Sequence, residues 1–310
     1  MTGKERIEAM LDGRIPDKIP HFELDFQLQE EAFGIKPLPH GEIASSGVDG
    51  IKTHLENYFA TWEKIIERYG WAAISVPTNF YGFYEGELIS MTKERLKGKT
   101  AVYCFNGEGT FWMPTGNQIM DFTVRLFEDL PSLHEEARRK RDASIELANR
   151  QIGQGADFIC INSDYGYNRG PFVSPEMFAD LVTPYLREIV DAIHSMGKKA
   201  ILHSDGDLRL ILDQLVSTGL GGYQSIDPQG SMDIAKVRKD YPDLVLMGNV
   251  QTSLLQETDE GPIRQSVRYA IESAKAGGRY IFSSSNCIFK GLPLESYHIM
   301  LDEYEKLAWY

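Results

Sequence analysis

Hydrophobic positions in the second half of the chain follow a repeating pattern of long amphipathic segments and short apolar runs. Each apolar run ends in a polar or glycine-containing turn. Alternation of this kind is typical of βα units, in which helices connect parallel strands. The pattern predicts strands over residues 157–164, 198–207, 221–228, 244–250 and 279–286. It predicts helices over residues 133–154, 174–196, 208–219, 233–240, 262–275 and from 294 onward.

The first half is less regular, with strand-like runs at 19–26, 71–77 and 101–114 and a helical pattern over 48–69. Five βα steps in under 160 residues indicate a closed or strongly curved parallel sheet. We therefore expect an α/β fold, a (β/α)8 TIM barrel, formed by residues 1–310 as a single domain. A doubly wound sheet is the alternative, although no GxGxxG or P-loop motif follows the early strands.

Composition and charge narrow the class of protein. The formal net charge is −13, which disfavours binding to a phosphate backbone, so we expect no nucleic-acid partner. No apolar run approaches the roughly 18 residues that span a bilayer, and the charged N-terminus does not resemble a signal peptide. The three cysteines lie far apart, as expected for reduced thiols. These features predict a cytoplasmic protein without a membrane partner.

Polar residues follow the predicted strands in register. They are Asp164, then His203 and Asp205, then Asp227, then Asn249, and finally Asn286 and Cys287. In a parallel barrel the carboxyl ends of the strands surround one mouth, where active sites are built. We therefore expect these side chains to face a common space.

The sharpest local signal is His203-Ser204-Asp205-Gly206. Residues i and i+2 of an extended segment point to the same side, so His203 and Asp205 can reach one ion or one substrate atom together. With Cys287 as a third ligand, they would form a catalytic zinc site with an open position. The alternative is a hydrogen-bonded pair that orders a turn, because Asp-Gly is also good turn chemistry.

The other candidate functional residues could instead have a purely structural role. Asp164 is a candidate catalytic residue that binds substrate or orients a ligand. Candidate substrate contacts are Asn79, Tyr81, Tyr165 and Asn249, with the aromatic segment 79–87 as a wall for an apolar or aromatic substrate. Aromatic clusters are more often core, and Gly248-Asn249 and Asp227-Pro228 can equally form turns.

Several motifs together resemble the superfamily of uroporphyrinogen decarboxylase and the cobalamin-dependent methyltransferases. They are ERIEAMLDGRIPDKIP, GADFICINSD, GPFVSPEMFADLVTPYLREIVDAIHSMGKKAILHSDGD, LMGNVQTSLL, GGRYIFSSSN and GLPLESY. The resemblance implies a (β/α)8 barrel. In the methyltransferases the zinc ligands resemble a His-x-Cys pair and a later Cys. Here His203 matches the histidine and Cys287 falls near the later cysteine, while Asp205 stands in place of the first cysteine.

Replacing a thiolate by a carboxylate gives a harder site and a stronger Lewis acid, suited to an oxygen leaving group. We therefore expect a methyltransferase that moves a methyl group from a small methylated substrate, a methoxylated aromatic compound, to Co(I) of a corrinoid protein. The implied cofactors are zinc and a corrinoid (cobalamin) carried by that partner, and a homodimer is left open.

Three rival functions remain. One is a metal-free decarboxylase or lyase that uses Asp164, although the segment HFELDFQLQEE lacks the arginine of the decarboxylase motif. Another is methyl transfer in the opposite direction, from methyl-corrinoid to a small acceptor. The last is a non-enzymatic module that binds the corrinoid protein.

Overall fold

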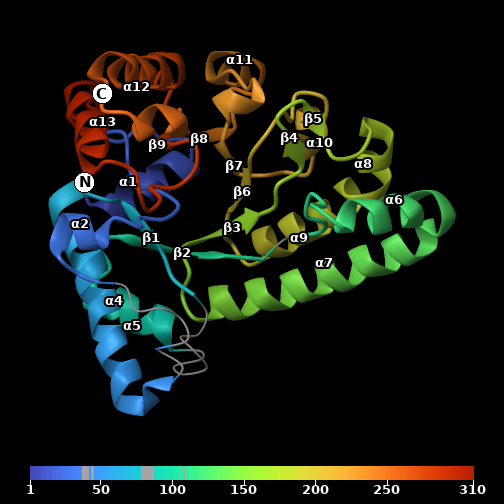
Figure 1. Ribbon diagram of the computed structural model, residues 1–310, viewed down its shortest axis with the longest axis horizontal. Coiled ribbons are helices and arrows are strands. Elements are labelled where there is room, and N and C mark those ends of the chain that lie inside the picture. The colour runs from blue at the N-terminus through green and yellow to red at the C-terminus, as the bar shows by residue number, and fades with distance from the viewer. Residues whose placement is uncertain (37–41, 43–44, 78–86, 108) are drawn as a thin grey trace.

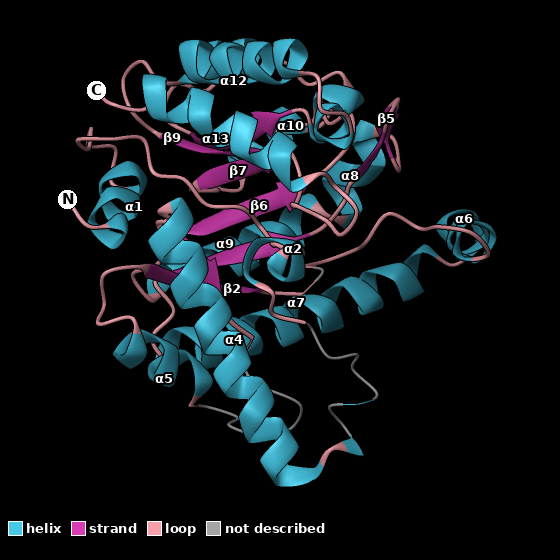
Figure 2. Cartoon of the chain, turned by 60° about the vertical axis from the view of Figure 1, so that its left-hand side comes forward, coloured by secondary structure: helices cyan, strands magenta, loops and turns pink. Residues whose placement is uncertain are grey.

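The computed structural model describes residues 1–36, 42, 45–77, 87–107 and 109–310. Among these residues, seven parallel strands form one sheet in the order β1-β2-β3-β6-β7-β8-β9. Their bounds are β1 (Ala73–Ser75), β2 (Ala101–Phe105), β3 (Phe158–Asn162), β6 (Ala200–Ser204), β7 (Gly222–Ser225), β8 (Val245–Val250) and β9 (Tyr280–Ser284). The sheet curls, and helices surround it (Figures 1 and 2). The predicted α/β fold with a parallel sheet is confirmed.

The curled sheet is nearly closed by the segment Ile19–Leu24. Phe282 N of β9 donates to Pro20 O at 2.9 Å, and Ala72 N, next to β1, donates to His21 O at 2.8 Å. The first and last strands of the sheet therefore approach the same segment from opposite sides. The segment forms only isolated bridges and is not a regular strand. The prediction of an eight-stranded barrel is thus confirmed only as a curled seven-stranded sheet.

The helices follow the predicted hydrophobic periodicity closely. In α7 (Leu130–Gly153) the buried positions Leu133, Ala137, Ser144 and Ala148 fall on one stripe of a helix. Asp129 caps this helix by accepting a hydrogen bond from Ser132 N. The other helices are α1 (Gly3–Leu11), α2 (Gln29–Phe33), α4 (Gly47–Tyr69), α5 (Leu88–Arg95), α6 (Gln118–Glu128), α8 (Pro175–Leu181), α9 (Thr183–Ser195), α10 (Leu212–Ser217), α11 (Ile234–Asp240), α12 (Glu260–Ala274) and α13 (Leu294–Leu307). No helix in the described part of the chain is long and apolar enough to cross a membrane.

Two predicted helices differ from the structure. The helix expected over 174–196 is two helices, α8 and α9, which meet at Val182 because Pro184 occupies the first turn of α9. The helix expected over 208–219 shortens to α10, since residues 205–211 form the turn after β6.

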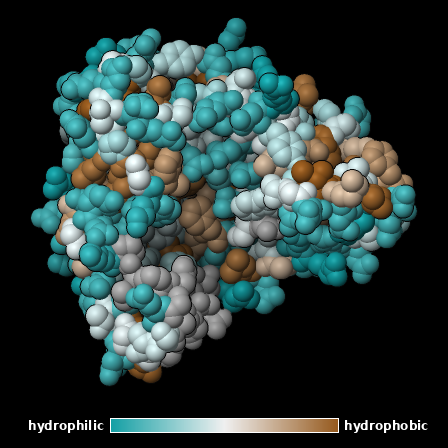
Figure 3. Space-filling model, viewed as in Figure 1, coloured by the Kyte–Doolittle hydropathy of each residue, from teal (hydrophilic) through white to brown (hydrophobic). Residues whose placement is uncertain are grey.

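Helix α6 was not predicted. It has no buried residue, and Ile119, Met120, Val124 and Phe127 are exposed. It lies at the outer end of the long α7, away from the sheet, where Figure 3 shows apolar side chains on the surface.

Three glycines bring the loops beyond β3, β6 and β7 into backbone contact. Gly206 has φ +85°, and a Cβ there would lie 2.2 Å from Gly166 O of the short strand β4 (Gly166–Tyr167), which pairs with β5 (Gly170–Pro171). A Cβ at Gly230 would lie 2.2 Å from Gly206 C. These contacts pack the loops tightly around Asp205, which directly precedes Gly206.

We predict that Gly206→Ala destabilises the fold by about 3 kcal/mol, because the methyl group meets backbone and the left-handed φ becomes strained. The matched control is Gly197→Ala, which shares a left-handed φ (+73°) but has no atom within 4 Å of the added methyl. The control should lose only about 1 kcal/mol. Chemical denaturation followed by circular dichroism measures both; equal losses would contradict the close packing at Gly206.

Candidate metal centre

Three potential metal ligands converge at the carboxyl ends of β3 and β6. Asp164, His203 and Asp205 each offer a ligand atom, and these atoms all lie within 4.8 Å of one another. The Nε2 atom of His203 is 3.7 Å from Asp164 Oδ1 and 3.9 Å from Asp205 Oδ2. The pairing of Asn162 with His203 in adjacent strands explains why the residues beyond β3 lie beside those of β6. These three side chains from neighbouring strand ends therefore lie together, and their roles stay predictions.

The orientation of the His203 ring depends on Gln224. In the paired strands β6 and β7, Gln224 is the register partner of His203. The amide nitrogen of Gln224 donates to Ser284 O at 3.4 Å and to Ser285 O at 3.5 Å. The amide oxygen must then face His203, where it contacts Nδ1. Because that oxygen can only accept, Nδ1 is the protonated nitrogen of the neutral ring, and Nε2 is the ring atom that faces the two carboxylates.

The carboxylate of Asp205 is held by neutral donors. Ser225 Oγ donates to Oδ1, and Asn286 Nδ2 donates to Oδ2. The backbone N–H of Asp205 donates to Asp164 Oδ1 at 3.0 Å, which links the two acids. Burial raises the pKa of the Asp205 carboxyl, and the carboxylates of Asp164 and Asp227 act in the same direction. The site therefore gathers negative charge in a partly dehydrated place.

These residues fit a divalent cation. The lone pair of a neutral imidazole repels two carboxylates that face it, and either a proton on Nε2 or a bound cation relieves this repulsion. Zinc takes imidazole nitrogen and carboxylate oxygen as ligands, and a ligating histidine commonly donates its other N–H to an acceptor, as His203 does to Gln224. The arrangement thus has the ligands of a three-residue site and the supporting contact that such sites use.

Cys287, the third predicted ligand, is not part of the converging set, in which Asp164 takes the third place. Its side chain is half-buried and packs against the hydrophobic core. Burial raises the pKa of its thiol to about 11, with nearby carboxylates contributing, so the free protein holds it as a thiol at neutral pH. Its role as a ligand stays a prediction.

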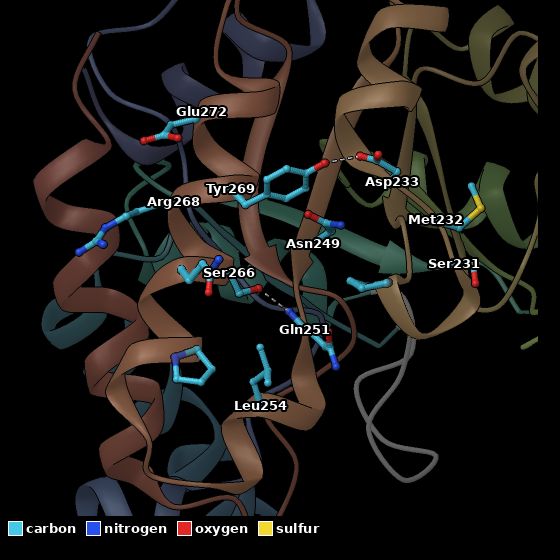
Figure 4. Close-up of a pocket in the computed structure, with 13 residues that line it drawn as sticks. Ser231, Met232, Asp233, Asn249, Gln251, Leu254, Ser266, Arg268, Tyr269 and Glu272 are labelled. Carbon is cyan, nitrogen blue, oxygen red and sulfur yellow. Dashed lines mark hydrogen bonds between the residues drawn. The ribbon is translucent and has the colours of Figure 1, made fainter.

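The predicted substrate contacts lie in different places. Tyr165 is fully buried, its ring packs against Phe178, and its hydroxyl pairs with Thr110 Oγ1 at 3.1 Å. Asn249 donates to Ile226 O. It also lines a groove of about 830 Å³ between the loop after β7 and α12 (Figure 4). Asp164, His203 and Asp205 are not among the residues that line this groove. Asn79 and Tyr81 lie outside the described residues. Substrate binding by these four residues stays a prediction.

Sequence reasoning missed Gln224, Ser225 and Glu23. Gln224 and Ser225 are polar residues inside the buried strand β7, and Glu23 is a fully buried acid in the segment that closes the sheet. A polar side chain in a strand buried on both faces is a usable signal, because it requires a buried partner. Its partner becomes visible only once the strand register is known.

Comparison with known proteins adds to this geometry. Residues 74–307 match the family model described as uroporphyrinogen decarboxylase (URO-D). The chain belongs to the URO-D family. The superfamily expected from the sequence motifs is thereby confirmed.

Two curated URO-D relatives and one solved structure are similar to the chain. Uroporphyrinogen decarboxylase of Dichelobacter nodosus is 26% identical over 71% of this chain, and that of Thermosynechococcus vestitus is 22% identical over 58%. The matches cover 63% and 54% of those relatives' own lengths. A methyltransferase from Methanosarcina mazei has 17% identity, a TM-score of 0.74 and 99% coverage of both chains, which shows a shared fold.

We predict that the metal-free protein loses stability relative to Asp205→Asn as the pH rises above 3.8, the ordinary pKa of the group. The folded state binds the Asp205 proton more tightly than the unfolded chain does. The stabilising contribution of the protonated Asp205 carboxyl is therefore complete below its ordinary pKa of 3.8. It is lost as the pH rises through the raised pKa of the folded state. Urea unfolding of both proteins between about pH 4 and 8 measures the difference. Parallel profiles would contradict the burial argument.

Proposed function

We propose that this URO-D family member is a corrinoid-dependent methyltransferase. It moves a methyl group from a small methylated substrate, a methoxylated aromatic compound, to Co(I) of a corrinoid carried by a partner protein. His203, Asp205 and Asp164 hold zinc, and Cys287 is the alternative third ligand. The observation that carries the proposal is the convergence of one imidazole and two carboxylates within 4.8 Å.

The donor set favours an oxygen leaving group. Carboxylate ligands are harder than thiolates and leave a bound ion more electrophilic. Bound zinc would supply Lewis-acid polarisation of the methyl-bearing oxygen, so that the C–O bond breaks with its electron pair on oxygen. The fold shared with the methyltransferase from Methanosarcina mazei supports the same class of reaction. The aromatic part of the substrate rests on the sequence of residues 79–87 alone.

The protein's own residues supply orientation. Gln224 accepts from Nδ1 of His203 and so aims the Nε2 atom at the acids. Ser225 and Asn286 fix both oxygens of Asp205, and the Asp205 amide fixes Asp164. A site assembled in advance avoids reorganisation when charge develops on the leaving oxygen. The loops after β3, β6 and β7 would surround the approaching partner.

Decarboxylation without metal is the second candidate, since both curated relatives carry that name. The charge at the site argues against a polycarboxylate substrate. The described hydrogen bonds to Asp164 and Asp205 come from an amide N–H, a hydroxyl and a carboxamide, none of them cationic. A substrate with several carboxylates would meet like charge here.

Zinc content and methyl transfer test the proposal together. We predict near-stoichiometric zinc in the wild type by elemental analysis, and zinc-dependent methylation of Co(I) cobalamin, seen by absorbance, with one of a panel of methoxylated benzoates and phenols. His203→Ala and Asp164→Ala should lose zinc and slow the reaction at least about 100-fold, as expected when several kcal/mol of polarisation are removed.

The matched control is Cys287→Ser, which preserves size beside the same site. It should keep its zinc and stay within a few-fold of the wild-type rate. Zinc lost in Cys287→Ser but kept in Asp164→Ala would restore Cys287 as the third ligand. If the reconstituted wild type holds no zinc, the Lewis-acid proposal is overturned. If the protein consumes methylcobalamin when an acceptor is added, methyl transfer runs in the direction opposite to the one proposed.

A further inference from the structure

A buried carboxylate outside the candidate metal centre, Glu23, binds the end of β9. Glu23 has no exposed surface. Its Oε2 accepts hydrogen bonds from Ser284 N at 2.9 Å and from Ser284 Oγ at 2.6 Å, and its Oε1 lies 3.2 Å from His21 Nε2. Hydrogen bonds to a charged acceptor are among the strongest in proteins. Ser284 is therefore held firmly from the side of the N-terminal segment.

Ser284 is also linked to the metal centre, through Gln224. Its carbonyl oxygen accepts a hydrogen bond from the Gln224 amide, whose oxygen contacts His203. Two residues further along, Asn286 donates to Asp205, and its own carbonyl lies 3.2 Å from Ser284 Oγ. The segment 284–286 thus supports both the imidazole and one carboxylate of the centre.

We infer that Glu23 is a positioning residue of the metal centre, acting through Ser284. It fixes the strand end that orients Gln224 and Asn286, and through them His203 and Asp205. The metal part of this inference rests on the proposed function. Supporting contacts of this kind typically change metal affinity by about 10- to 100-fold when removed.

A purely structural role is the competing explanation, because the same contacts also tie segment 19–24 to β9. Glu303 provides a matched control. It is a buried carboxylate on α13, 3% exposed, and it pairs with Arg264 and Arg268 of α12 instead of with the centre. Glu23→Gln and Glu303→Gln remove the same charge from two buried, hydrogen-bonded places.

The experiment measures zinc affinity by chelator competition, and backbone hydrogen exchange in the metal-free proteins, for the wild type and both variants. We expect Glu23→Gln to bind zinc about 10- to 100-fold more weakly. It should also exchange faster in peptides that cover 203–205 and 284–287. Glu303→Gln should keep wild-type zinc affinity and wild-type exchange in those peptides. Ser284→Ala should weaken zinc binding in the same direction, and combining it with Glu23→Gln should add less than the sum of the two effects.

The outcomes separate the two levels of the argument. If the wild type binds zinc and Glu23→Gln binds it with the same affinity, the positioning role is overturned, even if the variant is less stable. Should the wild type bind no zinc, the proposed metal function fails, and exchange decides on Glu23: faster exchange at 203–205 supports it, and unchanged exchange there overturns it. If Glu303→Gln weakens zinc binding as much as Glu23→Gln does, the loss reflects general destabilisation, and the positioning role of Glu23 is overturned as well.

Discussion

The hydrogen-bonded position of the Gln224 amide determines what the candidate site can do. Its nitrogen faces two backbone carbonyls at the end of β9, so its oxygen faces the Nδ1 atom of His203. The Nε2 atom of the imidazole then faces Asp164 and Asp205. Without this contact the ring could turn or adopt the other neutral tautomer, and its Nε2 atom would no longer be positioned as a ligand atom beside the two acids.

The same arrangement brings negatively charged groups close together in a buried place. Hydrogen bonds and backbone contacts around Asp205 hold them there. Burial raises the pKa of Asp205, which shows that its charged form is costly there. Ser225 and Asn286 offset part of that cost, and the backbone contacts of Gly206 leave the loop little room to relax. Unfavourable electrostatics of this kind are expected at sites where stability is given up for function.

Much of the fold could be predicted from the sequence, because the strands and turns follow from the order of neighbouring residues. Apolar runs followed by polar turns located the strands of the second half, and the spacing of His203 and Asp205 placed both on one side. Gln224 could not be paired with His203 without the register of β6 and β7. Asp164 belongs to the converging set, while at the end of β9 it is Asn286, the neighbour of Cys287, that donates to Asp205. The strand-like segment 19–26 makes only isolated bridges to its neighbours.

X-ray absorption at the zinc edge of the reconstituted protein tests the central claim most directly, because it reports the atoms bound to the ion. A site of His203, Asp205 and Asp164 should show only nitrogen and oxygen neighbours at about 2.0 to 2.2 Å, with the outer-shell signature of one imidazole. A sulfur neighbour at about 2.3 Å would contradict the account, since it would place the Cys287 thiolate on the metal.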